Sequence, residues 1–185
     1  MAINLANNNS LANITALPSS ISGGAMTLLA TQTASGSANL SFTSGIDDTY
    51  DSYVFKFYNI HPATDNVQFL FNMSSDSGSN YNVTKTTTYF LAEHNATGGS
   101  ANLSYQSAKD LAQSTDFQKL MTDLGNAADE NLSGYLTIYN PSSTTFVKNF
   151  MSRTNAQAYS ATNISFDNYI AGYGNTTSAV DAIQF

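Results

Sequence analysis

The sequence predicts an all-β protein: an antiparallel β-sandwich of the jelly-roll kind, with one short helix and an N-terminal arm. Residues 53–60 and 67–73 carry aromatic and aliphatic side chains at every second position, and successive strand side chains point to opposite faces. Similar segments follow at short intervals, separated by Gly, Ser, Asn and Asp, which is typical of a sandwich or jelly roll. With 185 residues, 42% of them hydrophobic, the chain can bury the core of a single domain.

The strand candidates are taken in chain order. We expect nine strands, over residues 26–33, 37–43, 52–60, 67–74, 81–94, 134–140, 145–153, 164–173 and 179–185. Two of the turns between them are explicit. Residues 76–80 suit a tight reversal with a positive φ at Gly78, and Pro141 stands where a type I turn over residues 140–143 favours proline.

One segment departs from the β pattern. Its apolar residues recur at spacings of three, four and seven, which is the spacing of a helical face: Leu111, Phe117, Leu120, Met121 and Leu124. Gly125 stands where a helix would end. The pattern therefore predicts a helix over residues 116–124 that covers one end of the sandwich.

The chain is divided into an arm, residues 1–25, and a β-sandwich domain, residues 26–185. The arm is rich in Asn and Ser and has too little apolar surface for a core of its own. Its spaced apolar residues are expected to anchor it, either on its own domain or on a neighbouring molecule: Ile3, Leu5, Leu11, Ile14 and Leu17.

Composition excludes several classes of function. The net charge is −7 and the six basic residues are scattered singly, so the clustered positive charge that nucleic acids and anionic membrane surfaces require is absent. The chain has no cysteine, which removes disulfides and thiol chemistry. The N-terminus lacks the basic and continuous apolar regions of a signal peptide, and no stretch approaches the roughly 20 apolar residues of a membrane span. We expect a soluble protein made in a cytoplasm.

The residues that could carry chemistry form no recognisable catalytic pattern. The two histidines, His61 and His94, lack a Gly-x-Ser-x-Gly element that would accompany a triad, and the two glutamates, Glu93 and Glu130, suggest no facing pair of carboxylates. Most aspartates fall in turns, where Asp caps its own backbone. We expect no enzyme, no cofactor and no catalytic metal, with a structural ion left open at the oxygen-rich residues 45–48 and 129–131.

Outward-facing tyrosines are the remaining signal. Tyrosine is favoured at protein interfaces and on sugar-binding platforms because it is apolar with a polar tip. The candidates for glycan or partner contact are Tyr58, Tyr105, Tyr159, Tyr169 and Tyr173. Some of these side chains are alternatively cross-strand packing partners.

A set of short segments resembles a family of uncharacterised structural proteins of marine tailed bacteriophages. These are residues 40–47 (Leu-Ser-Phe-Thr-Ser-Gly-Ile-Asp), 53–55 (Tyr-Val-Phe), 59–65 (Asn-Ile-His-Pro-Ala-Thr-Asp), 77–81 (Ser-Gly-Ser-Asn-Tyr) and 140–143 (Asn-Pro-Ser-Ser). The resemblance covers residues 26–185 and implies a place on the virion exterior, as a tail-fibre or minor structural protein. Members of that family run past the equivalent of residues 182–185 into a further strand, so we expect either a shorter protein or an unpaired sheet edge here.

The first functional hypothesis is therefore a non-enzymatic phage virion structural protein, assembled in the host cytoplasm. It would be a tail fibre or adhesin, or a capsid-decorating protein, that docks on other virion proteins of the capsid or tail. We expect a homo-oligomer, a trimer or another closed ring. The alternative is a carbohydrate-binding module that recognises a host surface glycan. A glycan depolymerase is a more distant third.

Overall fold

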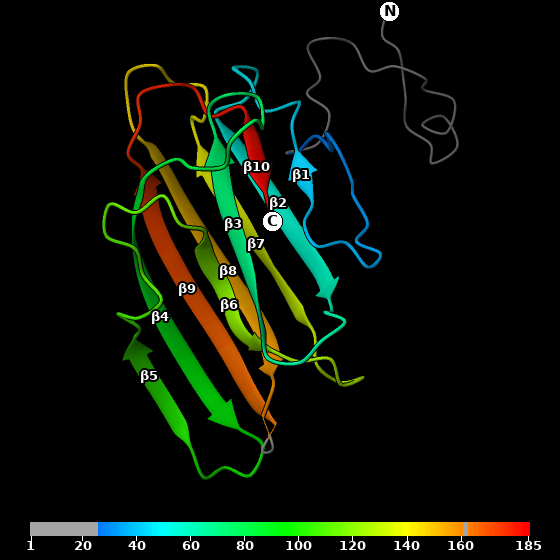
Figure 1. The fold of residues 1–185 in the computed structure, drawn as a ribbon. Coiled ribbons are helices and arrows are strands. Elements are labelled where there is room, and N and C mark those ends of the chain that lie inside the picture. The colour runs from blue at the N-terminus through cyan, green and yellow to red at the C-terminus, as the bar shows by residue number, and fades with distance from the viewer. Residues whose placement is uncertain (1–25, 161–162) are drawn as a thin grey trace, which may run out of the picture. The chain divides into compact units, whose positions relative to one another are not determined.

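The computed structural model describes residues 26–160 and 163–185, and over this range the chain forms ten antiparallel strands and no helix (Figure 1). The chain divides into two compact units, Met1–Thr31 and Gln32–Phe185, and all ten strands belong to the second. The arm and its five predicted anchors lie outside the described residues. The all-β antiparallel class predicted from the sequence is confirmed.

The strands pair in two runs that meet at one point. In chain order they are β1 Ser41–Phe42, β2 Ser52–Ile60, β3 Val67–Ser74, β4 Lys85–Asn95, β5 Ala101–Tyr105, β6 Gln118–Leu124, β7 Leu132–Tyr139, β8 Lys148–Ala158, β9 Ile164–Gly174 and β10 Ala182–Gln184. One run has the order β1-β10-β3-β6 and the other β2-β7-β8-β9-β4-β5. A single residue pair, Leu124 with Ala158, joins β6 to β8.

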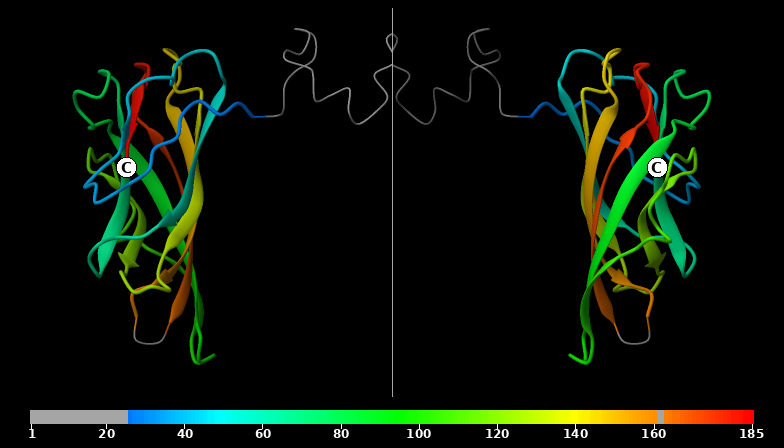
Figure 2. Two further views of the ribbon diagram at one scale, coloured as in Figure 1. Left: turned by 90° about the vertical axis from the view of Figure 1, so that its right-hand side faces the viewer. Right: turned by 90° about the vertical axis from the view of Figure 1, so that its left-hand side faces the viewer.

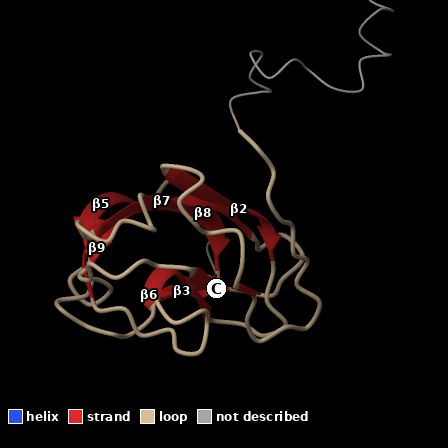
Figure 3. Ribbon diagram, turned by 90° about the horizontal axis from the view of Figure 1, so that it is seen from above, coloured by secondary structure: helices blue, strands red, loops and turns tan. Residues whose placement is uncertain are grey.

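The two runs lie in two layers. Seen from above, β2, β7, β8 and β5 follow one curved row and β3 and β6 lie in the other (Figure 3). In the side views the long strands β8 and β9, gold and orange, pass down one side of the Gln32–Phe185 unit (Figure 2). Alternate residues are buried along most of the long strands β4, β8 and β9, and the buried set includes Tyr53, Phe57, Phe71, Met73, Tyr89, Leu120, Leu136, Ile138, Phe150 and Ile170.

An aromatic cluster closes one part of this core. The ring of Phe185 lies at its centre, with ring centroids 5.0 to 6.5 Å from those of Phe42, Phe55, Phe57, Phe69 and Phe71. These rings come from β1, β2 and β3, so the cluster ties the two layers together. Two of these five pairs are edge-to-face, with Phe42 and Phe57, and aromatic pairs in such a geometry contribute roughly 0.5–1.5 kcal/mol beyond the area they bury.

The predicted helix is wrong: its residues form β6. Leu120 and Met121 are neighbours in sequence and both are fully buried, which a regular one-sided strand does not allow. The pairing of β3 with β6 shifts register on both sides of Phe69, and Asp123 has a φ of 57°. These irregularities turn the side chains of β6 out of strict alternation, and the resulting spacing of three and four imitates a helix.

One predicted strand is absent, and one observed strand was not predicted. Residues 26–33 form no strand, and their side chains are all exposed, Leu28 to 82%. Conversely, β5 was missed because its sequence, Ala-Asn-Leu-Ser-Tyr, is short and has little apolar surface. Its position is fixed by pairing with β4, in the register of Phe90 with Tyr105.

Of the two alternatives left open for the C-terminal segment, an unpaired edge at the last described strand is not what the structure has. β10 lies between β1 and β3 and pairs with both, Ile183 facing Phe42 on one side and Met73 on the other. The backbone of Phe185 continues this pairing, since it exchanges two hydrogen bonds of 2.9 Å with Leu40. The predicted turn over residues 76–80 is confirmed, with a φ of 81° at Gly78.

Candidate functional site

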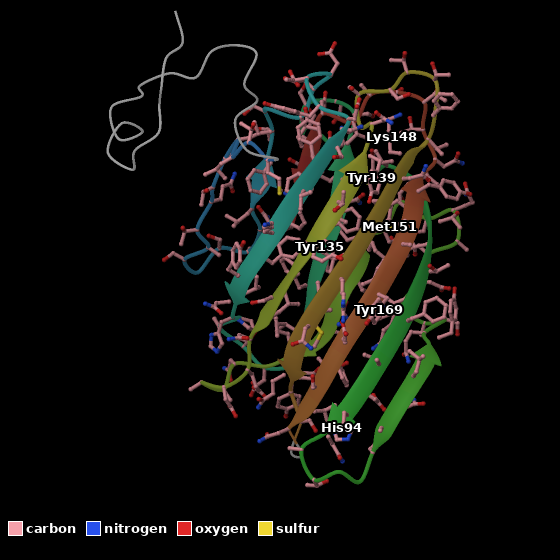
Figure 4. All side chains as sticks on the ribbon, turned by 180° about the vertical axis from the view of Figure 1, so that it is seen from behind. His94, Tyr135, Tyr139, Lys148, Met151 and Tyr169 are labelled. Atoms are coloured by element: carbon pink, nitrogen blue, oxygen red, sulfur yellow. The ribbon has the colours of Figure 1, made fainter. Side chains whose placement is uncertain are left out.

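The outward face of the six-stranded run β2-β7-β8-β9-β4-β5 carries one continuous row of directly paired residues. The row crosses all six strands, from β2 to β5: Lys56, Tyr135, Arg153, Tyr169, Phe90 and Tyr105. We call these six residues the aromatic row. Figure 4 shows two of them, Tyr135 and Tyr169, on neighbouring parts of this face together with Met151.

The large apolar side chains along this row are exposed to solvent. The exposed fractions of the four rings, Phe90, Tyr105, Tyr135 and Tyr169, lie between 40 and 47%. Met151, on β8 and one outward position from Arg153, is 56% exposed. Single exposed apolar residues are common, but a contiguous group of them marks an interaction surface.

Arg153 organises the centre of the aromatic row. Its Nε and Nη2 donate hydrogen bonds of 2.9 and 2.7 Å to the two carboxylate oxygens of Asp167. Its guanidinium lies over the Tyr169 ring, 4.8 Å from the centroid, and the Tyr169 hydroxyl donates to Asp167 Oδ2 at 3.0 Å. A bidentate pair that also stacks on a ring holds all three side chains in one geometry.

These contacts shift the pKa values of the three groups in the expected directions. The hydrogen bonds from Arg153 lower the pKa of Asp167, and those to Asp167 raise the pKa of Arg153. The hydrogen bond to Asp167, and then partial burial, raise the pKa of the Tyr169 phenol. At neutral pH the site therefore contains an ion pair and an un-ionised phenol.

A polar cleft of about 540 Å³ lies on the same face, toward the end where β8 runs into β9. Its floor includes a second row of paired outward residues, Gln157 on β8, Ser165 on β9 and His94 on β4. Figure 4 places His94 at this end of the sheet. Asp129 and Asn131, which precede β7, line the other side.

Several side chains in the polar cleft are held in place by hydrogen bonds. Gln157 Nε2 donates to Asp129 Oδ2 at 2.9 Å. Asn155 Nδ2 donates to the Phe166 carbonyl at 2.8 Å and to Ser165 Oγ at 3.3 Å. The amide oxygens of Gln157 and Asn155 accept no hydrogen bond from any described residue. The cleft therefore presents fixed amide acceptors to whatever enters it.

The five predicted contact tyrosines are not brought together. Tyr169 and Tyr105 belong to the aromatic row, and Tyr173 lies half-buried on the same outward face of β9. Tyr58 is 71% exposed near the end of β2, and Tyr159 follows β8, its backbone N–H bonded to the Asp123 carbonyl at 2.6 Å. Tyr58 is one outward position from Lys56 of the row, whereas no contact among the described residues links Tyr159 to it.

Sequence reasoning missed Tyr135, Phe90, Arg153, Met151 and the polar cleft. Hydrophobicity alternates with a period of two along residues 132–139 and 148–158, and this alternation indicates correctly which side chains point outward. Which of them become neighbours depends on register between strands that are distant in sequence. No local pattern carries that information.

The residue types considered for chemistry are placed as follows. The His61 ring makes a 3.1 Å hydrogen bond with the Ala127 carbonyl oxygen, and His94 lines the polar cleft. Within residues 26–160 and 163–185, no group of three or more His, Asp or Glu side chains is positioned to hold a metal ion. The same residues contain no helix with the length and apolarity needed to cross a membrane.

Two buried lysines lie inside the fold, away from the site. Lys85 on β4 and Lys148 on β8 are both fully buried, and both pair with Gly174 on β9. Figure 4 labels Lys148. Lys85 Nζ donates to Asn72 Oδ1 at 2.5 Å and to the Val83 carbonyl at 2.7 Å. Lys148 Nζ donates to the carbonyls of Phe146 and Thr176. Both ammonium groups are thus bonded to neutral oxygens.

Comparisons of this chain with models of known protein families, with curated proteins and with solved structures gave no match. The resemblance to phage structural proteins therefore stays a prediction from the sequence segments. Function has to be argued from the aromatic row and the polar cleft.

The substitution Asp167→Ala tests the organisation of the aromatic row. It removes the acceptor of the Tyr169 hydroxyl, so we expect the pKa of Tyr169 to fall, while the free energy of unfolding changes by less than about 1 kcal/mol. NMR titration of the tyrosine ring signals measures the pKa. Tyr105 is the internal control, because its hydroxyl donates to Asp110, which raises its pKa independently. An unchanged Tyr169 titration would show that Asp167 does not hold the ring.

Proposed function

We propose that this chain is a non-enzymatic structural protein on the exterior of a bacteriophage particle, a tail fibre or adhesin or a capsid-decorating protein. The observation that carries the proposal is the aromatic row, a group of exposed rings aligned across six paired strands, which is the kind of surface that marks an interaction site. The arm and the loops would dock on other virion proteins, of the capsid or tail. Assembly would take place in the host cytoplasm.

We further propose that the Gln32–Phe185 unit is a β-sandwich of the jelly-roll kind. The two layers of strands with apolar side chains between them support this. Such units commonly assemble with closed symmetry, and a trimer or another closed ring fits attachment to a symmetric particle.

Mass spectrometry of purified particles tests the virion assignment. We expect peptides of this chain at a fixed ratio to the major capsid protein, because a structural component has a defined copy number. A few to a few dozen copies would place it in the tail, and hundreds would place it on the capsid. Particles that lack the chain while infected cells contain it would contradict the proposal.

A second function, recognition of a host surface glycan, is favoured by a specific observation. The polar cleft offers amide, hydroxyl and imidazole groups on the same face as the exposed rings. Sugar-binding sites combine such groups, because hydroxyls need hydrogen-bonding partners and ring faces need an apolar surface. The two functions are compatible in a protein displayed on a virion.

A further inference from the structure

We propose that the polar cleft and the centre of the aromatic row are two ends of one binding site, which takes a neutral oligosaccharide lying along β8 and β9. This inference rests on the proposed glycan recognition and deepens it, since it names the residues and the charge class of the ligand. It concerns the Gln32–Phe185 unit alone.

The register of two strands makes the site continuous. The outward residues of β8 are Gln157, Asn155 and Arg153 in succession, and those of β9 opposite them are Ser165, Asp167 and Tyr169. Four residues of a strand separate the Ser165 and Tyr169 positions, which at about 3.3 Å per residue corresponds to roughly 13 Å. A ligand that reaches from the cleft to the row must be an oligomer rather than a single sugar.

Hydrogen-bonding capacity in the polar cleft suits hydroxyl groups. Gln157 and Asn155 are fixed through their NH₂ groups and keep their carbonyl oxygens for a ligand. His94 and Asn131 make no side-chain hydrogen bond with any residue in the described part of the chain, so their polar atoms are available too. A sugar hydroxyl both donates and accepts, and this set supplies both partners. The volume of about 540 Å³ lies in the range of small-molecule sites.

The row supplies the apolar surface at the other end. Tyr135 and Tyr169 flank Arg153 on the two neighbouring strands, and each ring is close to half-exposed. Arg153 lies over one side of the Tyr169 ring and Asp167 holds its hydroxyl, so the ring is fixed before a ligand arrives. A fixed ring loses little conformational entropy on binding, which favours affinity.

Charge selects a neutral ligand over an acidic one. The one cation among the six β8 and β9 residues, Arg153, is already paired in bidentate fashion with Asp167. The cleft contributes a carboxylate, Asp129, and the whole chain carries a net charge of −7. An acidic polysaccharide would therefore meet repulsion along β8 and β9, because the other cation of the aromatic row, Lys56, lies beyond Tyr135 on β2, outside the two strands of the site.

NMR titration of the full-length protein tests the site. The probes are neutral gluco-, galacto-, manno- and xylo-hexasaccharides, with an alginate hexamer as the acidic counterpart. We expect at least one neutral hexasaccharide to shift amide signals of β8, β9 and the residues around Asp129 and Asn131, and the alginate hexamer to shift none. Gln157→Ala and Tyr169→Ala should each weaken the binding by about tenfold, the loss that one hydrogen bond or one stacked ring implies.

A matched control lies near the opposite end of the same strand. Phe146, 72% exposed just before β8, is outside the site, so Phe146→Ala should bind the hexasaccharide as the unmodified protein does. The proposal is overturned if no neutral probe shifts these signals, if the alginate hexamer binds more tightly, or if neither site variant weakens binding. These outcomes are independent of the virion assignment, which particle mass spectrometry decides separately.

Discussion

Gly134→Ala is expected to lower the free energy of unfolding by about 3 kcal/mol, the upper part of the range for overpacking a well-packed interior. Gly134 lies on β7, between Phe57 on β2 and Thr154 on β8. A Cβ atom there would stand 2.3 Å from the Arg153 carbonyl oxygen and 2.8 Å from the Thr154 Cα. Both are backbone atoms of a central strand, so relief requires β8 to move and its hydrogen bonds to lengthen.

Urea and thermal unfolding measure this effect. For a chain of this size, 3 kcal/mol corresponds to a fall of roughly 6–12 °C in the melting temperature. Gly99→Ala is the matched control, because a Cβ there meets its nearest atoms at 3.5 and 3.8 Å, which is ordinary contact. Equal melting temperatures for the two variants would mean that β7 and β8 do not approach as closely as described.

Lys85→Met is expected to change how stability depends on pH. Burial lowers the pKa of Lys85 from 10.5 to about 8, while the charge of Asp116 opposes the shift. Between pH 8 and 10.5 the unfolded chain then binds more protons at this site than the folded chain, so this lysine makes stability rise with pH in that window. Below pH 8 the buried ammonium group of Lys85 lowers the free energy of unfolding by its full amount. At about 1.4 kcal/mol per pKa unit, the cost is about 3 kcal/mol.

The variant isolates this contribution, because every other titrating group is common to both proteins. We expect the stability advantage of Lys85→Met over the unmodified protein to be largest at pH 7 and to shrink by about 3 kcal/mol up to pH 10.5. Chemical denaturation at a series of pH values gives the difference. Lys56→Met, which removes an exposed ammonium group, is the matched control. A difference that stays constant with pH for Lys85→Met would refute the shifted pKa.

The strands were predicted accurately where apolar and polar residues alternate clearly along the sequence. The bounds of β2 and β3 were predicted to the residue, because their aromatic side chains alternate regularly between Ser52 and Ser74. β6 was predicted as a helix because Leu120 and Met121 are both buried in a strand of irregular register. Local periodicity identifies a strand where the residue types alternate, as Val67, Phe69, Phe71 and Met73 do in β3, and it misleads where neighbouring residues are both large and apolar, as in β6.

The candidate site was less predictable than the fold. Tyr169 and Tyr105 were identified as outward aromatics, but Phe90 between them and Arg153 and Tyr135 on the other side of Tyr169 were not. These residues come together through pairs such as Tyr135 with Arg153 and Tyr169 with Phe90, which link strands far apart along the chain. Strand order and register are properties of the assembled sheet, so they cannot be inferred from local patterns in a single sequence.

The position of β10 between β1 and β3 has a consequence for how fast the protein folds. Gln184 Nε2 donates to Ser41 Oγ at 2.9 Å across 143 residues of sequence. Closing so long a loop reduces the conformational entropy of the chain before the stabilising contacts between β10 and its neighbours can form. Folds rich in such long-range contacts therefore reach the native state slowly. During synthesis on a ribosome, β1 and β3 emerge well before β10. Until β10 arrives, the backbone N–H and C=O groups of β1 and β3 that pair with it remain unpaired. The protein is then most exposed to aggregation in the interval before its last described strand arrives.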